Sequence, residues 1–292
     1  MIFSLPAGTL LILVSTVLWG STFVVIKSAL GQAGPLELVF FRSAIAVLVA
    51  APFLRWTDPK ALRAGLELGV WMGMGHILQT VGLMHTTTNK SAFLTALCIL
   101  FVPIMNVLWG KKVSVAVWCC AGLALLGTGL LAYEHTPPNW GDVLTILSAI
   151  MYALYMVRME TLCHAGRSID LAGFQALGAA LCALAFGLRV APSLASVPWG
   201  ASLYLGVVIG LGCVLLQTEG QKRVPAAKAA ILLAAEPVWA SVFAYAFQGE
   251  RLGGRGLIGA FLIVFAVALV GVLNSKRSLP AACGDRLAPI VL

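Results

Sequence analysis

Long apolar segments, separated by short polar or proline-containing stretches, make up almost the whole chain. About 20 consecutive apolar residues are enough to cross about 30 Å of hydrocarbon as a helix. Windows of that length predict ten membrane-spanning helices, at residues 7–28, 35–54, 64–85, 90–109, 114–132, 141–161, 170–190, 200–221, 226–247 and 254–274. Turn-forming residues such as Asp58-Pro59 and Pro225 lie between them. The pattern predicts an all-α membrane protein.

Composition supports a lipid rather than an aqueous environment. The chain is 60% hydrophobic and only 10% charged, whereas soluble domains contain roughly 25% charged residues. The net charge is +8, but basic residues occur in ones and twos between apolar segments, as in Lys111-Lys112. No basic stripe could follow a phosphate backbone. The lipid bilayer is therefore an expected partner, and nucleic acid is not.

Lysine and arginine are distributed unevenly between the two sides that ten helices define. Even-numbered loops and the C-terminal tail carry about twelve, and odd-numbered loops with their helix ends carry about five. Because short cytoplasmic loops are enriched in Lys and Arg, both termini are predicted to be cytoplasmic. The expected location is the cell inner (cytoplasmic) membrane.

An internal repeat relates the two halves of the chain. Three glycines recur at an offset of 137 residues, since Gly69, Gly73 and Gly75 match Gly206, Gly210 and Gly212. At an offset of 138, Leu78-Gln79-Thr80 matches Leu216-Gln217-Thr218, and Lys90 matches Lys228. More weakly, Ser15, Trp19 and Gly20 align with Ser148, Tyr152 and Ala153.

The repeat predicts how the chain is organised in the membrane. Each half would contain five helices, an odd number, so the second half must enter with the opposite orientation. The predicted units are residues 1–133, the first five-helix repeat, 134–275, the second, and 276–292, a cytoplasmic tail. In inverted-repeat transporters the solute site lies near mid-membrane between the halves, and rocking about it gives alternating access.

Short motifs along residues 7–275 resemble those of the drug/metabolite transporter superfamily, specifically its EamA-type ten-helix members. They are Trp19-Gly20-Ser21-Thr22-Phe23, Phe40-Phe41-Arg42, Ala235-Glu236-Pro237 and Gly249-Glu250-Arg251-Leu252. The chain looks most similar to bacterial amino-acid and metabolite exporters. The resemblance implies a substrate cavity lined mainly by helices one, three, four, six, eight and nine. Val102-Pro103 lacks the acid that precedes Pro237, so acids are not expected symmetrically in both halves.

Polar and aromatic residues within the helices are the candidates for substrate binding. His76 and Gln79 follow the helix face marked by Gly69 and Gly73, and Gln217 is the repeat partner of Gln79. Such groups are costly in a membrane and tend to be functional, although interhelical hydrogen bonds are an alternative role. The predicted substrate-binding residues are His76, Gln79, Trp19, Tyr152, Tyr155, Gln217 and Glu236. For the aromatic residues, simple packing is the alternative.

Prolines and helix-end lysines are candidates for moving parts. Pro103 and Pro237 interrupt the hydrogen bonding of the fourth and ninth helices and are predicted to be paired hinges. Lys90 and Lys228 begin the same two helices and are predicted to act in gating, with snorkelling to the interface as the alternative. Arg42 is expected to form a structural ion pair, with Glu236 a possible partner.

The function predicted from these features is a secondary transporter that exports small polar metabolites, amino acids before others. A nucleotide-sugar, phosphorylated-metabolite or drug transporter, or a non-transporting subunit of a membrane complex, are the alternatives. The chain contains no GxxxxGK[ST], HExxH or GxSxG sequence and no CxxC among its seven cysteines. No enzyme activity, metal or cofactor is expected. The expected partner is a small-molecule substrate, and a monomer is the simplest working unit.

Overall fold

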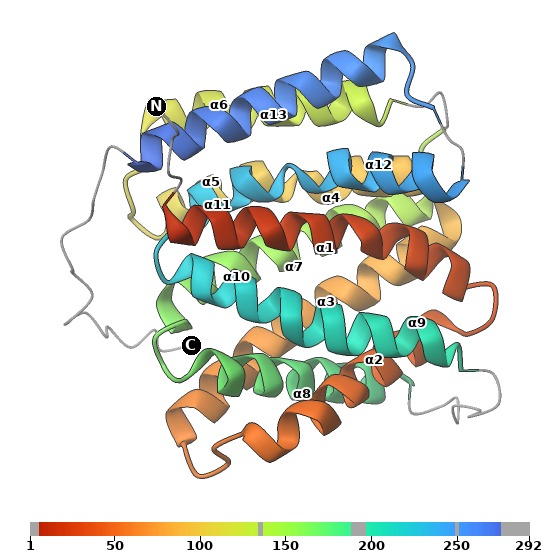
Figure 1. The fold of residues 1–292 in the computed structure, drawn as a ribbon, viewed down its shortest axis with the longest axis vertical. Coiled ribbons are helices and arrows are strands. Elements are labelled where there is room, and N and C mark those ends of the chain that lie inside the picture. Colours follow the sequence, from red (N-terminus) through yellow and green to blue (C-terminus); the bar gives the residue numbers. More distant parts are fainter. Residues whose placement is uncertain (1–5, 134–136, 188–196, 249–250, 276–292) are drawn as a thin grey trace.

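The computed structural model describes residues 6–133, 137–187, 197–248 and 251–275, which form helices and turns with no strand among them (Figure 1). The predicted tail at 276–292 and the Gly249-Glu250 pair lie outside the described residues. The all-helical prediction is confirmed for the described part of the chain.

The first half contains the helices up to residue 131. In chain order they are α1 (Ala7–Ala29), α2 (Pro35–Ala50) with the short 3-10 turn η1 (Ala51–Phe53), α3 (Pro59–His85), α4 (Thr88–Ala96), α5 (Cys98–Leu108) and α6 (Val115–Leu131). Asp58 caps α3 by accepting hydrogen bonds from the backbone N–H groups of Lys60 and Ala61.

The second half also combines long helices with an interrupted one. Its elements are α7 (Trp140–Leu162), α8 (Ser168–Gly187), α9 (Trp199–Leu203), the π-helical segment η3 (Tyr204–Cys213), α10 (Val214–Gln221), α11 (Ala226–Leu233), α12 (Glu236–Gln248) and α13 (Gly254–Ser275). The helix from α9 to α10 is continuous but widens into a π-helix through the glycine-rich stretch. Such segments are rare in proteins, and those that occur are often found at functional sites.

Eight helices of the described chain are long and apolar enough to cross a membrane. They are α1, α2 with η1, α4 with α5, α7, α8, α9 to α10, α11 with α12, and α13. Two further helices complete the bundle. The apolar α6 has 17 residues, and α3 has 27 residues but carries His76 and Gln79 in its second half. The predicted count of ten spans is therefore supported for eight.

The outer surface carries many large apolar side chains. In α13, the side chains of Leu257, Ile258 and Phe261 are 58–67% exposed. Water would penalise such a surface, whereas hydrocarbon solvates it. We conclude that the described part is a multi-span membrane protein whose outer helices contact lipid.

Helices pack closely where glycines meet on facing surfaces. Gly69 of α3 approaches Gly178 of α8, and Gly127 of α6 approaches Gly259 of α13. Small residues let backbones come together in membranes, where burial of apolar surface gives little driving force. Figure 1 shows α6 and α13 side by side at one edge of the bundle, and α2 and α8 at the opposite edge. The space between these edges contains the candidate site.

Candidate functional site

A cavity of about 80 Å³ lies among the central helices, several times the space of about 15 Å³ that one water molecule needs. The described residues that line it come from α1, α2, α3, α4, α5, α7, α10, α11 and α12. All seven predicted substrate-binding residues are among them: Trp19, His76, Gln79, Tyr152, Tyr155, Gln217 and Glu236. Residues far apart in the sequence therefore meet at one place.

Two matching hydrogen bonds bracket the cavity. The Tyr152 hydroxyl of α7 donates to Oε1 of Gln79 in α3 at 2.9 Å. The Trp19 Nε1–H of α1 donates to Oε1 of Gln217 in α10 at 3.0 Å. The repeat relates Trp19 to Tyr152 and Gln79 to Gln217, so the same aromatic–amide contact occurs once in each direction between the halves.

Each of these glutamines also donates one hydrogen bond from its amide nitrogen. Nε2 of Gln79 donates to Oγ1 of Thr95 in α4 at 2.9 Å. Nε2 of Gln217 donates to Oε1 of Gln221 at 3.2 Å, and Gln221 donates in turn to the carbonyl of Met156 at 3.3 Å. Gln79 therefore connects α3 to α7 and α4, and Gln217 connects α10 to α1 and to the next turn of its own helix. These bonds fix the orientation of both side chains.

Glycines make room for these contacts. A Cβ atom at Gly75 would lie 2.4 Å from the Tyr152 ring, so only glycine lets that ring pack across α3. Gly82 approaches the carbonyl of Gly141, and the equivalent Gly220 approaches the carbonyl of Gly8. The α3–α7 and α1–α10 contacts are therefore built in the same way.

Arg42 and His76 form a buried polar pair in the cavity wall. Nη2 of Arg42 lies 3.1 Å from Nε2 of His76 and 3.4 Å from Nδ1, and the two residues are 3% and 5% exposed. The imidazole lies between the Trp19 ring, centroid to centroid at 6.0 Å, and the Tyr152 ring at 5.9 Å. No carboxylate within the described chain pairs with Arg42, so the expected ion pair is not seen there.

Glu236 faces the cavity from a helix interruption. The helix pauses at Ala234 and Ala235, and Glu236 begins α12 just before Pro237. Proline at this position cannot donate to the carbonyl of Leu233, which favours the interruption. Among the described residues, the Glu236 side chain has no hydrogen bond or ion-pair partner.

The matching interruption in the first half does not coincide with a proline. It lies at Leu97, between α4 and α5, whereas Pro103 is buried within α5. Leu97 and Ala235 are 138 residues apart, so the two interruptions are repeat partners although the two prolines are not. Pro237 is next to its interruption, and the pairing of Pro103 with it as a hinge stays a prediction.

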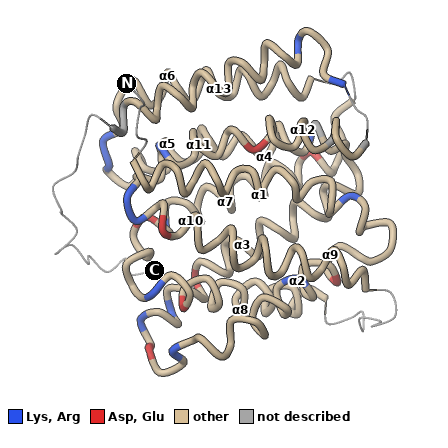
Figure 2. The backbone as a smooth tube through the Cα atoms, viewed as in Figure 1, with Lys and Arg blue, Asp and Glu red and all other residues tan. Residues whose placement is uncertain are grey.

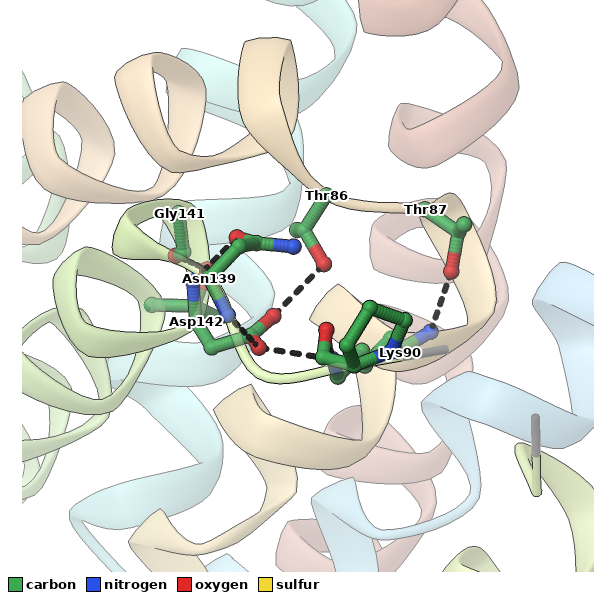
Figure 3. Close-up of polar contacts among 8 residues, drawn as sticks. Thr86, Thr87, Lys90, Asn139, Gly141 and Asp142 are labelled. Carbon is green, nitrogen blue, oxygen red and sulfur yellow. Dashed lines mark hydrogen bonds and ion pairs between the residues drawn. The ribbon is translucent and has the colours of Figure 1, made fainter. Parts of the chain in front are cut away.

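Lys90 belongs to a polar network at one end of the bundle, shown in Figure 3. Its Nζ lies 2.6 Å from Oδ2 of Asp142 and 3.0 Å from the carbonyl of Pro137. Oδ1 of Asp142 accepts from the hydroxyl of Thr86 at 2.7 Å, and Asn139 and Asp142 cap α7 reciprocally. The start of α4 is thereby tied to the start of α7. Lys228, which matches Lys90 in the sequence repeat, lies near the start of α11.

Tyr155 contacts the cavity and a second buried amide. Its hydroxyl donates to Oε1 of Gln175 in α8 at 3.0 Å. Gln175 is fully buried, and its Nε2 has no hydrogen-bond partner in the described chain. Among the described residues, no group of three or more His, Cys, Asp or Glu side chains is suited to a metal ion.

Sequence reasoning did not predict every residue of the wall. It missed Thr95, Cys98 and Met156, for which neither charge nor spacing gave a signal. It assigned Arg42 to an ion pair, although a basic residue inside an apolar helix is also a signal for a ligand-binding group.

The known proteins that resemble this chain include proteins named as transporters. An uncharacterized transporter of Archaeoglobus fulgidus is 27% identical over 87% of this chain and 82% of its own length. The uncharacterized transporter YcbK of Bacillus subtilis is 29% identical over 89% of this chain and 91% of its own length. A solved crystal structure matches 94% of this chain and 99% of its own with a TM-score of 0.73 and 21% identity, which supports the fold.

The model of the EamA-like transporter family matches residues 6–133 and 139–272, which together cover most of the chain and leave the junction of its two halves between them. Together with the membrane-spanning helices and the polar cavity, this match shows that the chain belongs to the EamA-like transporter family and is a membrane transporter.

Proposed function

We propose that this transporter exports small polar metabolites, amino acids before others, by alternating access through the central cavity. The observation that carries the proposal is the pair of equivalent hydrogen bonds, Tyr152 to Gln79 and Trp19 to Gln217, on either side of one cavity. A site built twice, once from each half, can be approached from either side of the membrane.

The proposal includes ten spans in two inverted repeats. In support, α1 packs on α10 as α3 packs on α7, and α1 packs on α12 as α5 and α4 pack on α7. The two segments matched by the family model, 6–133 and 139–272, divide the chain close to the predicted junction of the repeats. An odd number of spans in each half requires opposite orientations.

The proposed orientation has both termini in the cytoplasm of a bacterial-type cell, with the protein in the inner membrane. Figure 2 shows Lys and Arg gathered at the end of the bundle where α1 begins. Arg55, Lys111, Arg158 and Lys222 belong to this end, and several pair with acids, as Arg158 does with Glu67 at 2.5 Å. A basic end of this kind faces the cytoplasm in most membrane proteins.

Contacts at one end of the bundle and beside the cavity support alternating closure. At one end Lys90 and Asp142 join α4 to α7. Beside the cavity, Gln217, Gln221 and the Met156 carbonyl join α10 to α7. Opening the cavity to either side would require breaking one set while the other holds.

The chemistry of the wall favours a small solute over a nucleotide sugar. Arg42 is the only Lys or Arg among the described residues that line the cavity. The diphosphate of a nucleotide sugar carries about one negative charge on each phosphate, and one guanidinium could not balance both. The mixed apolar and polar wall suits a small molecule with an apolar part.

Counterflow in proteoliposomes tests the proposal. Proteoliposomes containing the purified protein would be loaded with each of a panel of unlabelled amino acids, nucleotide sugars and phosphorylated sugars, and uptake of the same compound in labelled form would be measured. We expect accumulation of at least one amino acid and none of the phosphorylated compounds. Transport of a nucleotide sugar alone would favour the alternative solute class, and absence of flux for every compound would refute the proposed transport.

A further inference from the structure

The charged groups of the cavity break the repeat that the rest of the site follows. The aromatic–amide contacts and the glycine contacts recur in both halves. By contrast, Arg42 corresponds to Gln175 at the offset of 133 that relates Trp19 to Tyr152. Glu236 corresponds to Cys98 at the offset of 138 that relates Gln79 to Gln217.

Similar helix contacts support the equivalence of these positions. A Cβ at Gly206 would lie 2.5 Å from the carbonyl oxygen of Arg42, and a Cβ at Gly69 would lie 2.3 Å from that of Gln175. Cys98 begins α5 directly after the interruption at Leu97, as Glu236 begins α12 after Ala235. Both Cys98 and Glu236 line the cavity. The framework therefore tolerates uncharged residues at these positions.

Arg42 retains donors that no described residue uses. Its contact with His76 engages one terminal nitrogen, and a guanidinium has five N–H groups in a planar fork. A cation that is 97% buried and has no described acid partner is costly unless an anion joins it. Carboxylates fit the fork with two parallel hydrogen bonds.

Glu236 presents the opposite charge to the same cavity. Its side chain is partly exposed and has no partner among the described residues, while its backbone packs on Gly20 of α1. A carboxylate in an apolar wall attracts an ammonium group. The Trp19 and Tyr152 rings on either side of His76 provide apolar contact area between the charged groups.

We propose that the cavity binds zwitterions at two poles, with Arg42 binding the solute's carboxylate and Glu236 its ammonium group. This assignment deepens and rests on the proposed transport function. Arg42 is thus a ligand-binding residue, and His76 positions its guanidinium while the aromatic–amide frame supports both. The first half supplies the positive pole, Arg42, and the second half the negative pole, Glu236, so one bound molecule connects the two halves.

Three related probes test the two poles in the wild-type protein. Leucine carries both charges, leucinamide lacks the carboxylate, and N-acetylleucine lacks the ammonium group. If leucine is not carried, the best amino acid of the counterflow panel and its two derivatives replace the set. We expect the half-saturation concentration in counterflow to be at least tenfold lower for the amino acid than for either derivative, since charge-assisted pairs are the strong ones.

Variants separate a ligand contact from a structural role. Arg42→Gln should abolish the discrimination between leucine and leucinamide while keeping that against N-acetylleucine. Glu236→Gln should do the reverse. Arg42→Lys keeps the charge without the fork and should retain part of the discrimination. Arg223→Gln, a matched change at a 54%-exposed side chain outside the cavity, should alter neither ratio.

Every outcome bears on the proposal. Equal transport of amino acid and amide by the wild type overturns the two-pole site and leaves the transport function in place. The same holds if only a solute without a carboxylate is carried, or if Arg42→Gln lowers all rates in proportion and keeps both ratios. If no compound moves, the transport function fails and the two-pole site with it.

Discussion

Nζ of Lys90 and Oδ2 of Asp142 lie 2.6 Å apart, and this ion pair joins the start of α4 to the start of α7 (Figure 3). The side chains are only 18% and 8% exposed, so the pair is screened less than a surface ion pair. The residue that corresponds to Asp142 in the first half is Thr9, which carries no charge. The acid of this ion pair is therefore not repeated in the first half.

Removing either charge should destabilise the protein more than its loss from a surface pair would. We expect Asp142→Asn and Lys90→Met each to lower the free energy of unfolding by about 1–3 kcal/mol, because the partner charge stays partly buried. The double variant should cost less than the sum. Thermal unfolding in detergent measures all three.

Lys111→Met provides the control, since Lys111 pairs with Glu160 at 3.0 Å but is 41% exposed. Its cost should be about 0–1 kcal/mol. Additive effects of Lys90→Met and Asp142→Asn would show that the pair contributes no coupling energy.

The hydroxyl of Tyr152 should contribute to transport through Gln79. Tyr152→Phe keeps the ring and removes the donor to Oε1 of Gln79. Loss of one buried hydrogen bond costs about 1 kcal/mol, so we expect the half-saturation concentration for the transported solute to rise roughly fivefold. Counterflow at varied concentration measures it.

Tyr204→Phe is the matched control for this change. The Tyr204 hydroxyl lies 2.6 Å from Oγ of Ser21 and does not line the cavity. It should leave the half-saturation concentration within about twofold of the wild-type value. An equal effect of the two variants would mean that the Tyr152 contact has no special place in the site.

Close glycine contacts between α3 and α8 predict a sharp difference between two Gly→Ala changes. At Gly69, a Cβ would lie 2.3 Å from the carbonyl oxygen of Gln175, so Ala must push the helices apart, at a cost of about 1–3 kcal/mol. At Gly122 of α6 nothing lies within 4 Å of the added Cβ. There Ala should stabilise the helix by up to about 1 kcal/mol. Thermal unfolding of both variants in detergent distinguishes these effects.

Much of the fold could be predicted because the membrane imposes simple rules. Segments of about 20 apolar residues must be helices, and the observed bounds agree within a few residues for α1 and α7. The two helices that do not qualify as spans by length or composition, α3 and α6, show where the rule is weak. In α3, the polar residues His76 and Gln79 lower the hydropathy of the helix. Both face the cavity and not lipid.

The interruptions and partners of the helices could not be predicted from the same rules. Pro237 marks the interruption that precedes α12, but no proline adjoins the equivalent interruption at Leu97. For Arg42, the sequence gives the charge but not the partner, since that depends on how α2 turns toward α3. The sequence repeat was a better guide to the cavity residues than proline or charge was to these features. Gln79 and Gln217, which match in the repeat, both line the cavity and accept a hydrogen bond from an aromatic side chain.

Glu236 should account for the pH dependence of transport, because it is the only carboxylic acid in the described cavity wall. Protonation neutralises it and removes the site for an ammonium group. In the wild type, the half-saturation concentration for an amino acid should therefore rise as the pH falls from about 8 to about 5, the range in which a carboxyl or an imidazole group can titrate. In Glu236→Gln it should stay constant and high.

The other titratable or charged groups that face the cavity are Arg42, His76, Cys98, Tyr152 and Tyr155. Of these, only His76 has an ordinary titration range within the interval tested, so His76→Gln is the control. It should preserve the pH dependence that Glu236→Gln removes. If the two variants behave in the opposite way, the proton is carried by the imidazole beside Arg42, and the negative pole has a fixed charge throughout transport.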